Sequence, residues 1–350
     1  MTIKFGKEYY EKVMEEYGYD PLEFERINFS IKGFSVDDLQ HQWLCHSGGK
    51  DFTDKLDMGV KSIVTTGFGL SGPPHMGTVS QIMRAIRFQQ KGLSTQIVLG
   101  DLDAFNGKMT EFSYTQELAH KYKEFIKNLG FIENENNILR SQFNSLHTLR
   151  TSYLLGHFLE DDMFLETEED LHEFYTKHGK VDSEMSYRRK LSLNLMIADF
   201  YDLAIKKGFE NVLVFLGIDE HKYVRLAQKL IKKTQDYPSL DINISISALY
   251  SSIIRGFNGF PKMSKSFPDS GITLNMSNAE IKDRVLNQEG NYSCPEDNVV
   301  YQMIASASFF NEKEIKEAYY SCLDRSPKWE KFKIEYAEQL NEVCAKWPLG

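Results

Sequence analysis

The sequence has little cysteine and no long apolar run. It has four cysteines, Cys45, Cys294, Cys322 and Cys344, which are scattered and form no C-x-x-C pair. We therefore expect reduced thiols, and neither a disulfide framework nor a protein-held metal. No apolar stretch approaches the roughly 20 residues that span a bilayer, and the first residues lack a signal-peptide pattern. We therefore expect a cytoplasmic protein that does not contact a membrane.

A basic excess is also lacking, because the formal net charge is -9 over 350 residues. This balance argues against a protein that grips nucleic acid over its whole surface, although one local basic face could still bind it. A hydrophobic content of 41% with 26% charged residues is typical of an ordinary globular chain. The length suffices for one large α/β domain and a smaller helical one.

Buried strands alternate with amphipathic helices along most of the chain. The stretches at 61–66, 95–100 and 211–216 read as buried strands, the last of them near-continuously apolar, and each is followed by a helical pattern. This alternation predicts an α/β fold, a Rossmann-like doubly wound parallel sheet with a small C-terminal helical domain. We expect three parts. Residues 1–56 form an N-terminal extension, residues 57–274 form the catalytic domain with a helical insertion at about 144–190, and residues 275–350 form the helical domain.

The most informative stretch is a loop at 261–270 that carries two lysines three residues apart, Lys262 and Lys265, beside serines, glycine and proline. Lysine is a compact charge on a flexible stem, so such a loop can close over a polyphosphate and stabilise charge that builds up on it. A solvated basic turn is the commoner interpretation of an isolated K-x-x-K pattern. The residues upstream decide between the two.

A second candidate phosphate site follows the strand at 61–66. A Gly/Pro-rich turn at 67–74 leads into His75-Met76-Gly77-Thr78, which opens a helix through about Gln90. Gly77 allows a nucleotide to approach the backbone, His75 can donate to a phosphate oxygen, and the helix N-terminus favours an anion.

These two stretches resemble the motifs of one family, the class I aminoacyl-tRNA synthetases. Lys262 to Ser266 reads KMSKS letter for letter, and His75 and Gly77 match the HIGH motif, with Thr78 where a second histidine is usual. The resemblance implies catalytic roles for His75, Lys262 and Lys265, and Thr78 is expected to weaken catalysis without abolishing it. It also implies an ATP site made by Gly72, Pro74, His75, Gly77, Thr78, Gly217, Asp219, Lys262, Met263, Ser264, Lys265 and Ser266.

Two further stretches resemble the tryptophanyl and tyrosyl branch of this family. Residues 193–203 (LNLMIADFYDL) are similar to the helix of tryptophanyl enzymes whose aspartate accepts the indole N–H, which implies amino-acid contacts for Met196 and Asp199. A surface aspartate is the alternative for Asp199. Gly217 to Arg225 resembles the archaeal-type G-x-D-Q turn, with Glu220 in place of the glutamine that contacts the amino group.

Asp101 and Asp103 end the strand at 95–100, where strand carboxyl ends line ligand sites in α/β sheets. We therefore expect them to meet the amino acid or ATP. The family carries histidine at the position of Asp103, and a turn or capping role is an equal alternative for that residue.

The resemblance is closest to tryptophanyl enzymes of the archaeal and eukaryotic type, since 267–274 (FPDSGITL) is similar to the segment that follows their KMSKS motif. It implies ATP- and Mg²⁺-dependent activation of an aromatic amino acid, most closely tryptophan, transfer to tRNA, and a homodimer. The region after residue 274 is short and not evidently basic, so two alternatives stay open. One is a synthetase-like enzyme that activates tyrosine or a non-standard amino acid for a non-tRNA acceptor; the other is an inactive paralogue that senses its ligand.

Overall fold

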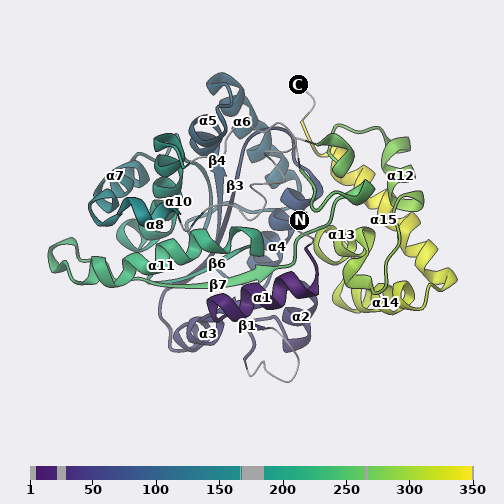
Figure 1. Ribbon diagram of the computed structural model, residues 1–350, viewed down its shortest axis with the longest axis horizontal. Helices are drawn as coiled ribbons and strands as arrows, with labels where there is room; N and C mark the ends of the chain where they lie inside the picture. Colours follow the sequence, from purple (N-terminus) through teal and green to yellow (C-terminus); the bar gives the residue numbers. More distant parts are fainter. Residues whose placement is uncertain (1–4, 22–28, 166, 168–184, 265–266, 349–350) are drawn as a thin grey trace.

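The protein is built around one seven-stranded sheet flanked by helices (Figure 1). The computed structural model describes residues 5–21, 29–165, 167, 185–264 and 267–348. The strand order is β1-β2-β7-β6-β3-β4-β5, in which the five strands from β7 to β5 are parallel and β1 and β2 pair antiparallel at one edge. The strands are β1 Asp20–Pro21, β2 Cys45–Ser47, β3 Ser62–Gly69, β4 Thr95–Gly100, β5 Asn137–Ser141, β6 Asn211–Gly217 and β7 Ser245–Ser251.

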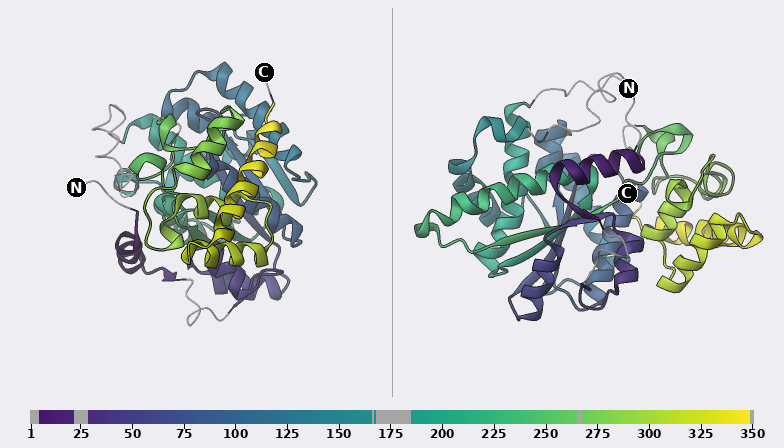
Figure 2. Two further views of the ribbon diagram at one scale, coloured as in Figure 1. Left: turned by 90° about the vertical axis from the view of Figure 1, so that its right-hand side faces the viewer. Right: turned by 60° about the horizontal axis from the view of Figure 1, so that its bottom comes forward.

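The helices cover both faces of the sheet, and the last four form a separate helical part beside it (Figures 1 and 2). Their bounds are α1 Lys7–Tyr17, α2 Val36–Gln42, α3 Gly49–Asp57, α4 Met76–Gln90, α5 Asp101–Lys108, α6 Phe112–Asn128, α7 Leu146–Leu155, α8 Asp161–Leu165, α10 Tyr187–Lys207, α11 His221–Gln235, α12 Asn278–Asn287, α13 Val299–Ala307, α14 Glu312–Leu323 and α15 Pro327–Ala345.

The alternation of side chains along the central strands produces two hydrophobic cores. In β6, Val212 and Val214 pack with α7, α10 and α11, whereas Leu213 and Phe215 pack with α3, α4 and α6 on the opposite face. Successive strand residues point to opposite faces, so a strand that is apolar at every position can be buried on both sides. This explains why the run at 211–216 reads as continuously hydrophobic.

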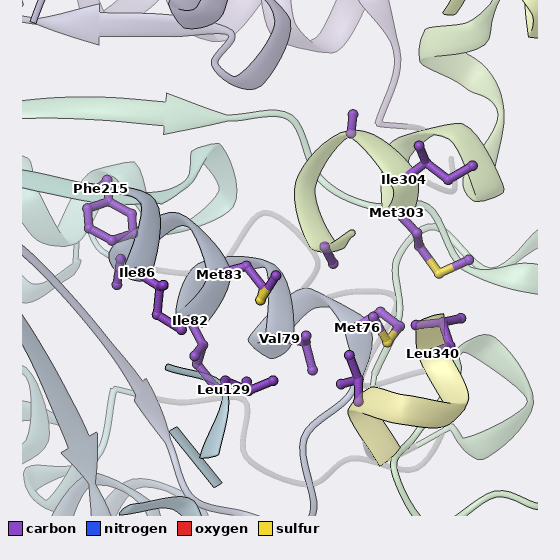
Figure 3. Packing of buried hydrophobic residues seen from close by; sticks show 14 of the residues in the cluster. Met76, Val79, Ile82, Met83, Ile86, Leu129, Phe215, Met303, Ile304 and Leu340 are labelled. Atoms are coloured by element: carbon purple, nitrogen blue, oxygen red, sulfur yellow. The ribbon is translucent and has the colours of Figure 1, made fainter. Parts of the chain in front are cut away.

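Helix α4 connects the sheet to the C-terminal helices. Figure 3 shows that its inner side chains lie near Phe215 of β6 at one end and near Met303 of α13 and Leu340 of α15 at the other. Val79, Ile82 and Ala85 on this helix are fully buried. The helix whose N-terminus carries His75 is therefore held from both sides.

The predicted fold class is confirmed: the structure is a Rossmann-like α/β fold with helices on both faces of a mainly parallel sheet and a helical C-terminal part. The strand predicted at 95–100 coincides with β4, and a capping box at Ser277 opens α12. Strand β7 was not predicted, because the sequence of 245–251 (SISALYS) mixes serine with apolar residues. The division into three segments stays a prediction, and residues 168–184 of the expected insertion lie outside the described residues.

Within the described ranges, no helix combines the length and the apolar character that crossing a membrane would require.

A buried ion pair joins α15 to the end of α12. The Lys333 side chain is only 2% exposed, and its Nζ donates to Glu289 Oε1 at 3.0 Å and lies 2.8 Å from Glu330 Oε1. Burial alone would lower the pKa of Lys333, but hydrogen bonds to the two carboxylates more than offset it, and its pKa stands above the usual range. The second oxygen of Glu289 accepts from Trp329 Nε1 at 3.0 Å and from Asn298 Nδ2 at 2.8 Å. Glu289 therefore satisfies three donors at once.

We expect Glu289→Ala to lower the free energy of unfolding by about 3–5 kcal/mol, because it leaves a buried lysine with one exposed carboxylate to balance its charge and removes the acceptor of two further donors. Urea unfolding followed by fluorescence measures the change. Glu330→Gln is the matched control, since Glu330 is 60% exposed, and it should cost at most about 1 kcal/mol. Equal costs for the two variants would contradict this account.

Candidate active site

A large cavity among the described residues opens at the carboxyl edge of the parallel strands. Its volume is about 880 Å³, and it is lined by the last residue of each of β3, β4, β6 and β7: Gly69, Gly100, Gly217 and Ser251. Ligands of open α/β sheets bind at this edge, where the strand order reverses. The size is that of a site for a drug-sized ligand or larger.

The HIGH-like segment forms one wall of this cavity. His75 is the N-cap residue of α4, and His75, Gly77 and Thr78 all line the cavity. A Cβ atom built on Gly77 would lie 2.8 Å from Cε1 of His75, so the imidazole packs against the bare glycine backbone. The histidine is thereby held over the start of the helix, where the helix dipole favours an anion.

The segment that follows the KMSKS motif pairs with the HIGH-like segment through the backbone. Met76 N donates to Ile272 O at 3.2 Å, Leu274 N donates to Pro74 O at 3.3 Å, and His75 faces Thr273 in an antiparallel bridge. Two motifs almost 200 residues apart are therefore fixed to each other at one corner of the cavity.

The described part of the KMSKS motif also faces the cavity. Lys262, Met263 and Ser264 line it, and Met263 is almost fully buried in the core. Lys262 Nζ donates to Asp219 Oδ2 at 2.7 Å, with only 23% and 18% of the two side chains exposed. Lys265 and Ser266 lie outside the described residues.

The turn after β6 supplies the carboxylate of this pair. A Cβ atom on Gly217 would lie 2.6 Å from Asp219 Oδ1, so the side chain folds back over the glycine and only glycine admits this approach. Gly217, Asp219 and Glu220 all line the cavity. The predicted nucleotide-binding turn and the KMSKS lysine are thus in direct contact.

The predicted amino-acid residues of α10 face the cavity from the other side. Met196 and Asp199 line it, together with Ser192 one turn earlier. Asp199 is only 2% exposed. Arg140 Nη2 donates to its Oδ1 at 2.8 Å, and Gln142 Nε2 donates to its Oδ2 at 2.8 Å. Asp199 is therefore a buried, partnered carboxylate and not a surface residue.

The environment of Asp199 acts on its charge in two opposed ways. Burial raises the pKa of Asp199 above its usual range, while the charge of Arg140 and the hydrogen bond from Gln142 lower it. Without these two donors, burial would raise the pKa of this carboxylate further and favour its protonated form.

The two aspartates after β4 are placed differently. Asp103 lines the cavity, and its Oδ2 would lie 2.7 Å from a Cβ atom on Gly69. Asp101 is fully buried and is not among the lining residues. Its carboxylate accepts from Leu102 N, Phe143 N and Gln116 Nε2 at 3.0–3.1 Å, so it fixes the start of α5 to the loop after β5.

Two further predicted residues, Gly72 and Pro74, also lie outside the cavity lining. Gly72 O accepts from Tyr122 Oη at 3.0 Å, and Pro74 O accepts from Leu274 N. Both residues therefore shape the turn before α4. From the sequence alone, this structural role could not be distinguished from contact with a ligand.

Several residues of the site were missed from sequence. Gln142 lines the cavity directly after β5, where the strand-end rule would have pointed to it. Phe5 of the N-terminal segment also lines the cavity, and its carbonyl accepts from Arg255 Nη2 at 3.2 Å. No local pattern signals that contact, because it joins residues 250 positions apart.

Comparison with known proteins agrees with this geometry. Residues 58–345 match the family described as tRNA synthetases class I (W and Y). The chain is 23% identical over 339 residues to a tryptophan--tRNA ligase of Methanocaldococcus jannaschii, covering 89% of this chain and 84% of the relative.

Solved structures share the fold. A tryptophanyl-tRNA synthetase of Aeropyrum pernix K1 superposes with a TM-score of 0.72 at 19% identity, covering 96% of this chain and 94% of the other. A tyrosyl-tRNA synthetase of Archaeoglobus fulgidus complexed with L-tyrosine gives 0.67 at 15% identity, covering 89% and 97%. With the family model spanning most of its length, the chain belongs to the tryptophan and tyrosine family of class I tRNA synthetases and is a ligase of the aminoacyl-tRNA synthetase type.

Proposed function

We propose that this protein activates tryptophan with ATP to form tryptophanyl-adenylate and pyrophosphate, and then transfers the aminoacyl group to tRNA. The observation that carries the proposal is that His75, Lys262 and Asp199 all line one cavity. The first two residues belong to the two nucleotide motifs of the family, and the third is a buried acceptor for an aromatic side chain that donates a hydrogen bond.

In the activation step, the amino-acid carboxylate attacks the α-phosphorus of ATP, and the bond to the bridging oxygen of the pyrophosphate breaks. Lys262 and Lys265 would stabilise the negative charge that builds on the leaving pyrophosphate, and His75 would donate to an oxygen near the α-phosphate. Mg²⁺ is commonly held by substrate phosphates and would neutralise part of their charge.

Asp219 would change partners during binding. In the structure its carboxylate is paired with Lys262, whereas a bound triphosphate offers the lysine a more negative partner. The aspartate would then be released to accept from the ribose hydroxyls or the α-ammonium group, and Glu220 beside it would accept from the ammonium group.

ATP–pyrophosphate exchange tests the activation step directly. Across the twenty standard amino acids, we expect exchange to be stimulated by tryptophan and to fall at least roughly tenfold in Lys262→Ala, which corresponds to about 1.4 kcal/mol of lost transition-state stabilisation. Lys282→Ala is the matched control, because this lysine is exposed on α12, and it should exchange like the wild type.

The same preparation tests the acceptor. A tRNA synthetase exchanges pyrophosphate and also charges total tRNA with radiolabelled tryptophan. Exchange without charging would indicate a different acceptor, and exchange with tyrosine alone would move the assignment within the family. Binding of ATP or tryptophan without any pyrophosphate exchange would indicate that the protein is a ligand sensor and not an enzyme.

We also propose a homodimer formed through an apolar face of α5, the start of α6 and α7. The rings of Phe105, Phe112 and Phe143 contact one another in series at centroid distances of 5.4 and 5.2 Å. Leu146 and Tyr153 continue the face along α7, where a spacing of seven residues places them on one side, and they are 72% and 88% exposed. Large exposed apolar patches of this kind mark interfaces.

Sedimentation velocity checks the dimer. We expect the wild type to sediment as a dimer and the double variant Leu146→Glu, Tyr153→Glu to sediment as a monomer, because two carboxylates would have to be buried at the interface. Tyr320→Glu is the control, since this tyrosine is 53% exposed on α14 and should leave the dimer intact. A monomeric wild type, or a dimeric double variant, would contradict the proposal.

A further inference from the structure

A chain of hydrogen bonds crosses the sheet and ends at the carboxylate of Asp199. Thr65 on β3 accepts from Gln96 Nε2 at 3.0 Å, and Gln96 Oε1 on β4 accepts from Arg140 Nε at 3.1 Å. Arg140 on β5 then donates through Nη2 to Asp199 Oδ1 at 2.8 Å. None of the three strand residues belongs to a motif of the family that the sequence displays.

The direction of each bond in this network is determined by groups that can only donate. Arg140 Nε is such a donor, so the oxygen of the Gln96 amide must face it and its nitrogen must face Thr65. The backbone N–H of Asp103 donates to Gln142 Oε1 at 3.1 Å, so the nitrogen of that amide must face Asp199. Reversing either amide would place its NH₂ group against another N–H donor, Arg140 Nε for Gln96 and Asp103 N for Gln142.

Both oxygens of Asp199 therefore receive hydrogen bonds from the protein. Oδ1 accepts from Arg140 and Oδ2 accepts from Gln142. A carboxylate has about four acceptor positions, which leaves it able to accept again, and Asp199 lines the cavity. The backbone carbonyl of Asp199 is also held, by Gln96 Nε2 at 3.4 Å and Arg140 Nη2 at 3.5 Å. The residue is thus fixed in position as well as in charge.

We propose that Arg140 is a positioning residue for the reaction: with Gln142 it keeps Asp199 an oriented, charged acceptor, and the cavity thereby selects an aromatic amino acid whose side chain donates one hydrogen bond. This inference rests on the proposed function and specifies how the side-chain pocket discriminates. Tryptophan offers an indole N–H that satisfies the acceptor. Phenylalanine offers no donor, so binding it would remove water from a buried carboxylate and give nothing in return.

The geometry separates this role from a purely structural one. Arg140 is not among the residues that line the cavity, and its contact with a lining residue is the ion pair with Asp199, through which it would act on the substrate. Burial raises the pKa of Asp199 and the charge of Arg140 opposes that rise, which agrees with a cation whose task is to keep the carboxylate ionised.

Steady-state pyrophosphate exchange with tryptophan and with phenylalanine tests the inference in wild type, Arg140→Gln, Arg140→Lys and Arg150→Gln. In Arg140→Gln we expect KM for tryptophan to rise roughly ten- to hundredfold with kcat much less affected, because an interaction used in binding is lost. The preference for tryptophan over phenylalanine should fall by a similar factor. Arg140→Lys should recover part of both, and Arg150→Gln, at an exposed position of α7, should match the wild type.

A double-mutant cycle with Asp199→Asn provides the decisive comparison. If Arg140 acts through Asp199, Arg140→Gln should have almost no further effect on the tryptophan-to-phenylalanine preference in the Asp199→Asn background. Additive losses, or a loss of kcat and thermal stability with discrimination unchanged, would overturn the inference and leave the proposed function standing. A wild type that exchanges pyrophosphate with no aromatic amino acid would overturn both, so the two failures are distinguishable.

Discussion

The backbone pairing between residues 272–274 and 74–76 is the contact on which the site depends. It consists of two hydrogen bonds and one antiparallel bridge, yet it joins the end of the KMSKS segment to the start of α4. Helix α4 packs in turn between the sheet and the C-terminal helices (Figure 3). Any movement of the C-terminal helices that shifts α4 would therefore also displace His75 and the base of the loop at 261–270. The pairing makes the positions of the two motifs interdependent.

A second constraint is the charge of the cavity before a nucleotide arrives. Lys262 is paired with Asp219 at low exposure, and a buried pair of this kind contributes little net stability because desolvation offsets the attraction. It does hold the lysine at the cavity wall and prevents an isolated charge from being buried there. A triphosphate that enters needs only to exchange one partner of the lysine for another. The lysine is thus already positioned in the free protein, and its side chain need not be ordered when the nucleotide binds.

Much of the fold could be predicted because its signals are local. Residues 97–99 and 212–216 are apolar at every position since both faces of these strands are covered, and the glycines at 69 and 217 mark the ends of β3 and β6. The bond of Arg140 to Asp199, the entry of Phe5 into the cavity and the bonds by which buried Asp101 fixes α5 to the loop after β5 could not be predicted. Each depends on residues brought together by the sheet order, which no single stretch of sequence contains.

The buried polar network around Asp199 is costly in desolvation, and its position beside the cavity accounts for its presence. Replacing such an ion pair by apolar side chains is often neutral or stabilising, so stability alone gives no reason to keep Gln96 on β4, Arg140 on β5 and Gln142 directly after β5 beside a ligand cavity. Selectivity gives one. A hydrophobic pocket distinguishes aromatic side chains only by size, whereas a buried acceptor that must be satisfied rejects a side chain without a donor far more strongly. The carboxylate can serve that purpose only if it stays charged and fixed, and the donors aimed at it from the sheet ensure both.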